Sequence, residues 1–93
     1  MTDGNFLNTM TVKDIFMIPA RGLVAAGQVT DGSFSVGDTV EILRQDGSAR
    51  TAEIGGIEIF MKALQTAKTG DRADILLKGM SKSDVGAGDI IRS

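Results

Sequence analysis

The side chains that could do chemistry in this chain of 93 residues include neither histidine nor cysteine. Without these two residue types there is no thiolate nucleophile, no cysteine-ligated zinc site, no Ser-His-Asp triad and no ordinary proton shuttle. The acid–base candidates that remain are pairs of aspartates, Asp71 with Asp74 and Asp84 with Asp89. General acid–base catalysis needs a pair tuned in a pocket, whereas aspartates scattered through loops are ordinarily just polar. We therefore expect that the chain is not an enzyme and holds no metal and no cofactor.

The basic residues are candidates for binding an anionic partner. Lys62, Lys68 and Arg72 fall close together in the sequence and would form a local positive patch. The formal net charge of −2 argues against free RNA or DNA as an independent ligand, because neutralising phosphates supplies most of the non-specific affinity. No segment has the pattern G-x-x-x-x-G-K-S/T, in which backbone N–H groups and a lysine cradle phosphates. We therefore expect that no nucleotide is bound by this chain.

Length and the first residues define the expected organisation. A chain of 93 residues is long enough for one small domain. We predict a single domain over residues 1–93, with residues 1–9 as a loosely ordered N-terminal extension. The first residues lack the basic region and the apolar stretch of a signal peptide, and no window approaches the roughly 20 apolar residues of a membrane span. A cytoplasmic protein with no membrane partner is expected.

The elements that must position these residues are short strands. Twelve glycines separate short apolar or alternating segments, which is typical of a small all-β barrel or sandwich. Residues 60–68 break the alternation, because Phe60, Leu64 and Ala67 have helical spacing, and we predict a helical turn there. Residues 81–84 resemble a capping box that starts one short turn. The strands predicted from alternation cover residues 13–18, 23–30, 39–43, 51–59, 72–78 and 89–92.

Two glycine positions imply a particular backbone geometry. In the second predicted strand, the alternating set Leu23, Ala25, Gly27 and Val29 has small members midway, which implies close approach of the backbone inside a tight barrel. In the fourth predicted strand, Ile54 and Ile57 have opposite phases, with Gly55 and Gly56 between them. A β-bulge at this pair of glycines would keep both isoleucines facing the core.

Two long segments resemble the second domain of elongation factor Tu. The first segment reads DIFMIPARGLVAAGQVTDGSFSVGDTVEI. The second reads GGIEIFMKALQTAKTGDRADILLKGMSKSDVGAGDII, with its Gly-Ile-Glu-x-Phe and its Leu-Leu-x-Gly followed by Gly-Asp. The resemblance runs from about Met10 to Ile91 and implies a closed six-stranded antiparallel β-barrel, in agreement with the predicted strands. It also implies a translation-related binding module, since in the relatives this barrel helps to hold the aminoacyl end of tRNA and contacts the ribosome.

The resemblance further implies a binding face. Glu58 and Phe60 match the family segment that helps to form the pocket for the aminoacyl end, and Lys62 matches the same segment. Arg21, in the Pro-Ala-Arg-Gly corner, matches a corner that relatives use against RNA or neighbouring domains. The candidate partners are therefore the ribosome, a tRNA or a translation factor. The alternative interpretation of these positions is solvated charged side chains beside a core phenylalanine.

Two candidate positions depart from the family pattern. Met61 stands where the family has a basic residue, and Arg72 stands where it usually has asparagine. Arginine can pair bidentately with a phosphate, whereas methionine offers an adaptable apolar contact to a protein. The second functional hypothesis is therefore protein–protein interaction or self-association as a homo-oligomer, with no RNA role, and exposed Met17, Met61 or Met80 would support it. The candidate binding residues under either hypothesis are Arg21, Glu58, Phe60, Met61, Lys62 and Arg72.

Overall fold

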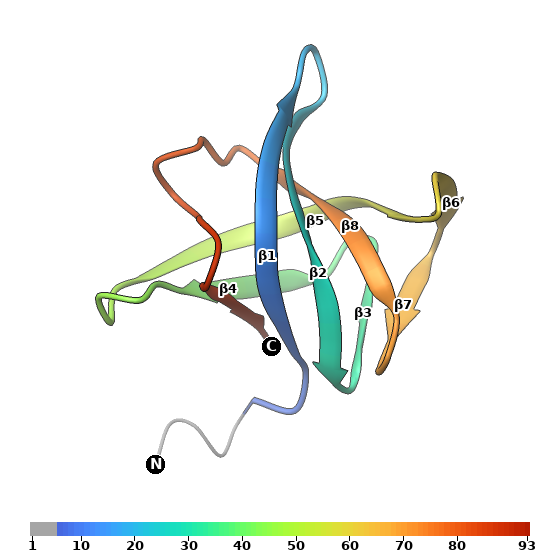
Figure 1. Cartoon of the computed structure of the whole chain (residues 1–93), viewed down its shortest axis with the longest axis horizontal. Coiled ribbons are helices and arrows are strands. Elements are labelled where there is room, and N and C mark those ends of the chain that lie inside the picture. The colour runs from blue at the N-terminus through green and yellow to red at the C-terminus, as the bar shows by residue number, and fades with distance from the viewer. Residues whose placement is uncertain (1–5) are drawn as a thin grey trace.

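The computed structural model describes residues 6–93, and every regular element in that range is a β-strand (Figure 1). The protein is therefore all-β, as predicted. The long strands β1 and β2 form a hairpin that projects beyond the rest of the molecule, and β5 crosses behind them (Figure 1). The nine strands are β1 (Thr9–Ile18), β2 (Gly22–Asp31), β3 (Ser33–Ser35), β4 (Thr39–Leu43), β5 (Ala49–Ile59), β6 (Lys62–Leu64), β7 (Thr66–Lys68), β8 (Arg72–Lys78) and β9 (Ile90–Arg92).

Six of the strands close into a barrel. The hydrogen-bonded order is β4-β9-β1-β2-β8-β5, and the additional pairing of β4 with β5 completes the ring. Every one of these pairings is antiparallel. The predicted closed six-stranded antiparallel barrel is thus confirmed, with β6 as an extra strand that pairs with the end of β5.

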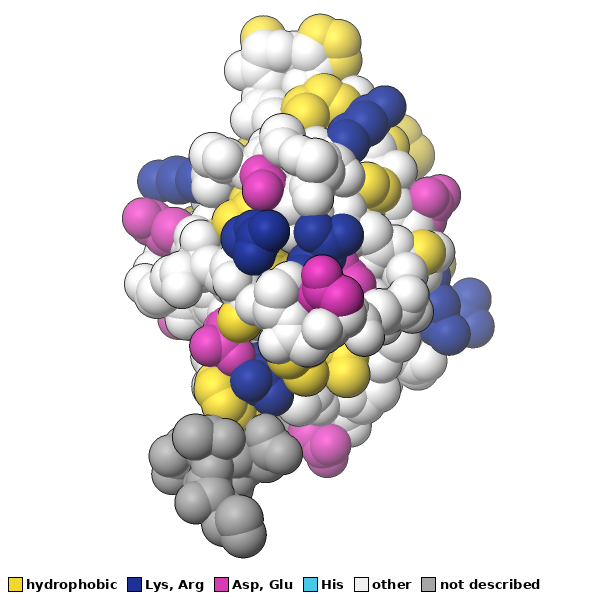
Figure 2. All heavy atoms as spheres, turned by 90° about the vertical axis from the view of Figure 1, so that its left-hand side faces the viewer, with side chains coloured by type: hydrophobic (Ala, Val, Ile, Leu, Met, Phe, Trp, Pro, Cys, Tyr) yellow, Lys and Arg dark blue, Asp and Glu magenta, His cyan; other side chains and the backbone are white. Residues whose placement is uncertain are grey.

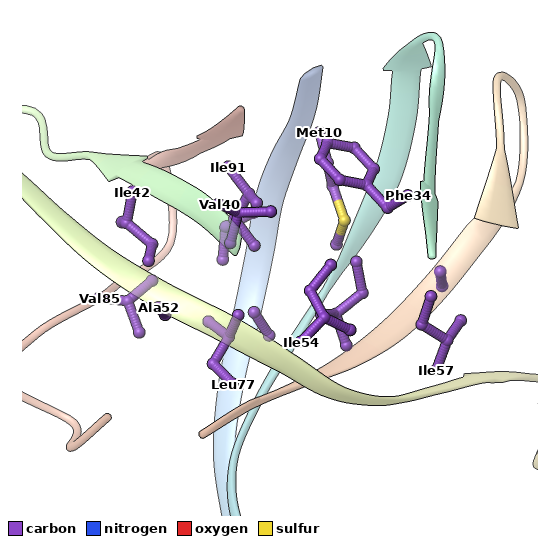
Figure 3. Packing of buried hydrophobic residues seen from close by; sticks show 14 of the residues in the cluster. Met10, Phe34, Val40, Ile42, Ala52, Ile54, Ile57, Leu77, Val85 and Ile91 are labelled. Atoms are coloured by element: carbon purple, nitrogen blue, oxygen red, sulfur yellow. The ribbon is translucent and has the colours of Figure 1, made fainter. Parts of the chain in front are cut away.

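The core lies inside this ring and comes from alternate residues of its strands. In β8, for example, Ala73, Ile75 and Leu77 are buried while their neighbours are not. Figure 3 shows side chains from facing strands meeting in the interior, with Met10 and Phe34 close together at one end. Because the chain has four phenylalanines and no tryptophan or tyrosine, aliphatic side chains supply most of the apolar area whose burial stabilises the barrel.

Both glycine predictions are confirmed. A Cβ atom on Gly27 would lie 2.0 Å from the carbonyl oxygen of Thr11, so only glycine allows β1 and β2 to approach this closely. Between β5 and β8 the register shifts after Ile54, and Ile54 and Ile57 are both buried on either side of the shift. This β-bulge reverses the inward phase and bends β5 around the barrel.

Of two predictions of local structure outside the long strands, one is wrong and one is confirmed. The helical turn over residues 60–68 is wrong, because this segment forms β6 and β7 instead. Its apolar spacing has another cause, since Phe60 is at a turn and exposed while Ala67 on β7 is buried against the core. Residues 81–84 do form a turn, in which the Asp84 carboxylate accepts hydrogen bonds from the backbone N–H and hydroxyl of Ser81, each at 2.9 Å.

The first nine residues were expected to form an extension. Residues 1–5 lie outside the described residues, while Thr9 begins β1. The backbone N–H groups of Leu7 and Asn8 donate to the carbonyl oxygen of Ser93 at 2.9 and 3.0 Å. The described part of the segment before β1 is therefore hydrogen-bonded to the C-terminal end of the chain.

The end of the barrel opposite β6 is held by ion pairs. The buried carboxylate of Asp89 lies 2.6 Å from Nε of Arg44 and also accepts a hydrogen bond from the backbone N–H of Gly86 at 2.8 Å. Arg50 pairs with Asp84 at 3.7 Å on the same side. Figure 2, which views the molecule from the side of the β4–β5 hairpin, shows basic and acidic side chains interspersed there. These pairs fix the loop before β9 against the β4–β5 hairpin.

Candidate binding face

The candidate site lies on the outer face of the barrel, where β2, β8 and β5 run side by side. Their register places outward-facing residues in rows across the strands, with successive rows two residues, or about 6.8 Å, apart. We call this surface the outer face. Its first row is Val24, Leu76 and Gly56, its second is Ala26, Asp74 and Glu58, and its third begins with Gln28 and Arg72.

The first row is apolar and is covered by the β1–β2 hairpin. Phe16 and Ile18 fold over Val24 and leave a cavity of about 30 Å³, which is room for little more than a water molecule. Val24 is therefore only 4% exposed although it points away from the barrel interior. This row is a small second core on the outside of the barrel, and it offers no space for a ligand.

The second row carries two carboxylates directly opposite each other. Glu58 on β5 pairs in register with Asp74 on β8, and like charges so placed repel. Arg21 reaches across from the β1–β2 turn, and its Nη1 lies 3.4 Å from Oε2 of Glu58. Among the described residues the carboxylate of Asp74 has no ion pair or hydrogen bond of its own. Partial burial and, second, the neighbouring Glu58 raise the pKa of Asp74.

The third row opens into a groove of about 520 Å³. Arg72 and Lys13 border this groove, and in the part of the chain that the structure describes neither cation has an ion-pair partner. Asp74 lies at its boundary with the second row. The floor is made of small residues, Ala26, Gly27 and Ala73. The groove is therefore shallow, open and bordered by free positive charge.

The far wall of the groove is the turn between β5 and β6, which we call the Phe60–Met61 tip. Phe60 is 94% exposed and Met61 92% exposed, so Phe60 is not the core phenylalanine of the alternative interpretation. Their φ angles are +52° and +63°, the left-handed region that L-residues adopt at a cost of roughly 1–2 kcal/mol each. A two-residue hairpin turn with both φ angles positive normally carries Asn-Gly. Two bulky apolar residues at this turn are thus both strained and exposed to water.

The structure brings most of the predicted site residues together on this face. Arg21 contacts Glu58, and Phe60, Met61 and Arg72 all line the groove. Lys62 is exposed at the start of β6 and does not line the groove.

Three groove residues were missed as binding residues from the sequence: Lys13, Gln28 and Asp74. Gln28 and Asp74 could have been found, because strand alternation and the β2–β8 pairing put them beside Arg72. Lys13 could not, because it lies at a register shift between Val12 and Asp14 that depends on the pairing with β2. The patch expected from Lys62, Lys68 and Arg72 is not formed within the groove, to which only Arg72 of the three contributes.

Comparison with known families identifies the barrel. Residues 22–92 match the family described as elongation factor Tu domain 2. The chain belongs to this family. The matched range includes β2, β5 and β8 with the whole Phe60–Met61 tip, so the outer face is a surface of the elongation factor Tu domain 2 barrel itself. Lys13 and Phe16, which border this face from β1, precede the matched range.

Two further observations describe the elongation factor Tu domain 2 barrel as it occurs here. Across residues 6–93 no three His, Cys, Asp or Glu side chains gather in a way that would hold a metal ion. None of these residues belongs to a helix long and apolar enough to cross a membrane.

Proposed function

We propose that this chain is a non-catalytic binding module of translation that contacts RNA through its outer face. Family membership supports the link to translation. The observation that carries the RNA contact is the groove, which is lined by the exposed ring of Phe60 and by Arg72 and Lys13, two cations without an ion-pair partner among residues 6–93. Proteins that bind single-stranded nucleic acids combine these two elements, since cations neutralise the phosphates and aromatic rings stack on the bases.

The groove dimensions and polar groups suit a single strand. An open surface of this kind can accept one splayed base against Phe60 while the adjacent phosphates lie toward Arg72 and Lys13. Gln28 adds a side-chain amide able to donate to or accept from a base or a sugar hydroxyl. The two carboxylates in the second row repel phosphates, so the affinity of the isolated chain for RNA is modest and salt-dependent. Tight contact with the ribosome or a tRNA would then need binding surfaces in addition to the outer face.

The test is a fluorescence-anisotropy titration with a short single-stranded RNA at two salt concentrations. If two cations contact phosphates, the logarithm of the association constant falls with the logarithm of salt concentration with a slope of about −1.4. We expect Arg72→Ala to reduce that slope by about half. Phe60→Ala should weaken binding about tenfold at either salt concentration, because a stacked base contributes roughly 1–3 kcal/mol.

The matched control is Lys82→Ala, which removes an exposed cation from the loop between β8 and β9. This variant should bind like the unchanged chain. Equal losses in Lys82→Ala and Arg72→Ala would mean that RNA senses only the overall charge, and the proposed face would then be wrong.

The Phe60–Met61 tip favours a second candidate, a protein-interaction module with no RNA role. Exposed apolar side chains mark interfaces when they gather, and Met17 is also 41% exposed. Met80 supports this candidate less, because it packs partly against the core. If the chain is a protein-interaction module, RNA titrations show no saturable binding. The Phe60–Met61 tip is then the part of the surface that the partner protein covers.

A further inference from the structure

The outer half of β1, residues 14–18, is an edge strand without the usual protection. β9 pairs with β1 only at residues 9–11, and beyond them β2 is the only strand of residues 6–93 that pairs with β1. Residues 15–18 are Ile-Phe-Met-Ile, so both faces of this segment are apolar and uncharged. Natural edge strands are ordinarily protected by lysine, proline or charged side chains, because an apolar edge is a template for pairing with another strand.

The backbone of β2 shows which residues of the hairpin bond to each other. The N–H of Val29 donates to the carbonyl oxygen of Asp71 at 3.0 Å, and its C=O accepts from the N–H of Gly70 at 2.8 Å, so Val29 faces the β8 side. Because the direction of these groups alternates along a strand, those of Val24 face β1 instead. Val24 pairs in register with Phe16. The N–H and C=O groups of Phe16 therefore point toward β2.

By the same alternation, the N–H and C=O groups of Ile15 and Met17 point away from β2. The N–H of Ile15 donates to the carboxylate of Asp14 at 2.8 Å, and the other three groups have no partner among residues 6–93. This stretch is closed at both ends, since Val12 already bonds to the loop before β9 and Pro19 has no N–H. The edge therefore offers two outward-facing residues, separated by one.

The side chains of this segment are also exposed on both faces. Phe16 on the outer face is 39% exposed, and Met17 on the opposite face is 41% exposed. The β1–β2 hairpin projects beyond the rest of the molecule in both views (Figures 1 and 2), so its edge is within reach of another chain. A strand laid along this edge would bond to the outward-facing groups and cover both side chains.

We propose that residues 14–18 pair with the same residues of a second copy of this chain, as antiparallel strands of one continuous sheet. The twofold axis is normal to the sheet and passes between the two Phe16 residues. Ile15 of each copy then lies opposite Met17 of the other, and each such pair exchanges two N–H···O bonds. At the N–H of Ile15, a carbonyl oxygen of the second copy replaces the carboxylate of Asp14. Every outward-facing backbone group of the segment is thus paired.

An identical strand suits this edge because the pairing brings apolar side chains together on both faces. Phe16 meets its counterpart at a non-hydrogen-bonded position, where the Cα atoms are only about 4.5 Å apart, and aromatic pairs so placed are favourable. On the opposite face Met17 packs against Ile15 of the other copy. Asp14 lies opposite Ile18, so no like charges meet. Contact is confined to one strand from each copy, and we expect a small, reversible interface that forms at high protein concentration.

The test is sedimentation velocity over a range of protein concentrations. The unchanged chain should shift from its monomer mass of 9.8 kDa toward twice that mass. Met17→Pro should remain monomeric, because proline removes an N–H that points to the second copy and leaves the β1–β2 ladder intact. Met17→Thr is the matched control, since it removes the same side chain but keeps the N–H. It should dimerise no more than about tenfold more weakly than the unchanged chain.

Cross-linking tests the position of the axis, since the chain contains no cysteine of its own. In Phe16→Cys the two thiols face each other across a Cα separation of about 4.5 Å, which a disulfide can span. This variant should form a covalent dimer under mild oxidation much faster than Lys62→Cys. Lys62 is exposed on β6, on the far side of the molecule from this edge (Figure 1).

Several outcomes would overturn the proposal. They are a chain that stays monomeric throughout, dimerisation that persists in Met17→Pro, and equal loss of the dimer in Met17→Thr and Met17→Pro. Cross-linking of Phe16→Cys no faster than that of Lys62→Cys would also overturn it, and this comparison decides alone if circular dichroism shows Met17→Pro to be unfolded. RNA titration separates this inference from the proposed function. Met17 lies outside the groove, so Met17→Pro should lose the dimer and bind RNA like the unchanged chain.

Discussion

At the scale of single residues, the outer face is defined by charges that the barrel leaves unpaired. Arg21 pairs with Glu58 and so neutralises one carboxylate of the second row. Asp74 keeps its charge beside Glu58 in a partly buried position, and both effects raise its pKa. A carboxyl group with a raised pKa favours folding while it is protonated, and that contribution is lost as the pH rises through the raised pKa. Asp74 is thus tolerated at a cost to stability at neutral pH.

Asp74→Asn should remove this cost. We expect the variant to be more stable than the unchanged chain at neutral pH, and the difference to shrink as the pH falls toward the ordinary aspartate pKa of 3.8. Urea denaturation midpoints measured across this range check the prediction. Glu53→Gln is the control, because it loses an ion pair with Lys78 and shows no gain at neutral pH. A difference that does not vary with pH would contradict the assignment.

Replacing the two residues of the Phe60–Met61 tip should raise the stability of the fold and weaken binding. The double change Phe60→Asn with Met61→Gly installs the residues that positive φ angles favour. We expect the free energy of unfolding to rise by about 1–2 kcal/mol, since the left-handed strain is relieved. RNA binding should weaken, because the aromatic ring that stacks on a base is removed. Met17→Gly, at an exposed position with negative φ, should instead lower stability. A less stable double variant would mean that the tip is not strained.

At the scale of elements, strand alternation predicted what lies inside the barrel better than what lies on it. The inward sets of β4 and β8 follow from their sequences alone, and Gly55-Gly56 marked the bulge in β5 because the apolar phase reverses there. Residues 60–68 were misjudged because Ala67 and Leu64 suit a helix as well as two strands of three residues. The periodicity of so short a segment cannot distinguish them. Only tertiary pairing with β5 and β3 decides it.

The groove itself depends on long-range pairing. Arg72 was identified through the resemblance, but its neighbours Lys13 and Gln28 come from β1 and β2, about 45 to 60 positions earlier in the chain. Their proximity is set by the β2–β8 register and by the shift after Val12. A one-residue change in that register would send Gln28 to the interior.

The close approach of the paired strands β1 and β2 should not tolerate a side chain at Gly27. In Gly27→Ala the new Cβ would meet the backbone oxygen of Thr11 at 2.0 Å, and a backbone atom cannot move aside as a flexible side chain can. We expect a loss of about 3 kcal/mol in the free energy of unfolding, at the upper end of overpacking costs. Gly86→Ala is the control, because its Cβ would meet nothing closer than 4.0 Å. Equal stability of the two variants would show that the strands can separate.

At the scale of the whole molecule, the β4–β5 hairpin and the outer face differ in how their arginine and lysine side chains are paired. Ion pairs at the β4–β5 hairpin use Arg44 and Arg50, whereas Arg72 and Lys13 on the outer face lack such partners among residues 6–93. A net charge of −2 is therefore compatible with one face that attracts anions. The outer face combines cations that are unpaired among residues 6–93 with the exposed Phe60–Met61 tip, and for this reason we propose it as the binding surface.

The barrel should not bind GTP. The 93-residue sequence contains no phosphate-cradling G-x-x-x-x-G-K-S/T segment, and the family match is to domain 2. Isothermal titration calorimetry with GTP and magnesium should give no saturable heat. Saturable binding in the micromolar range would contradict this prediction and would require a phosphate site elsewhere on the barrel.

The most direct test of the outer face is an NMR titration of the isotopically labelled chain with a short single-stranded RNA. If RNA binds the outer face, the amide shifts concentrate on Gln28, Arg72, Asp74 and the Phe60–Met61 tip. Shifts concentrated on β4 and β9 at the other side of the barrel, or no shifts at all, would contradict the claim that the outer face is where this protein binds RNA.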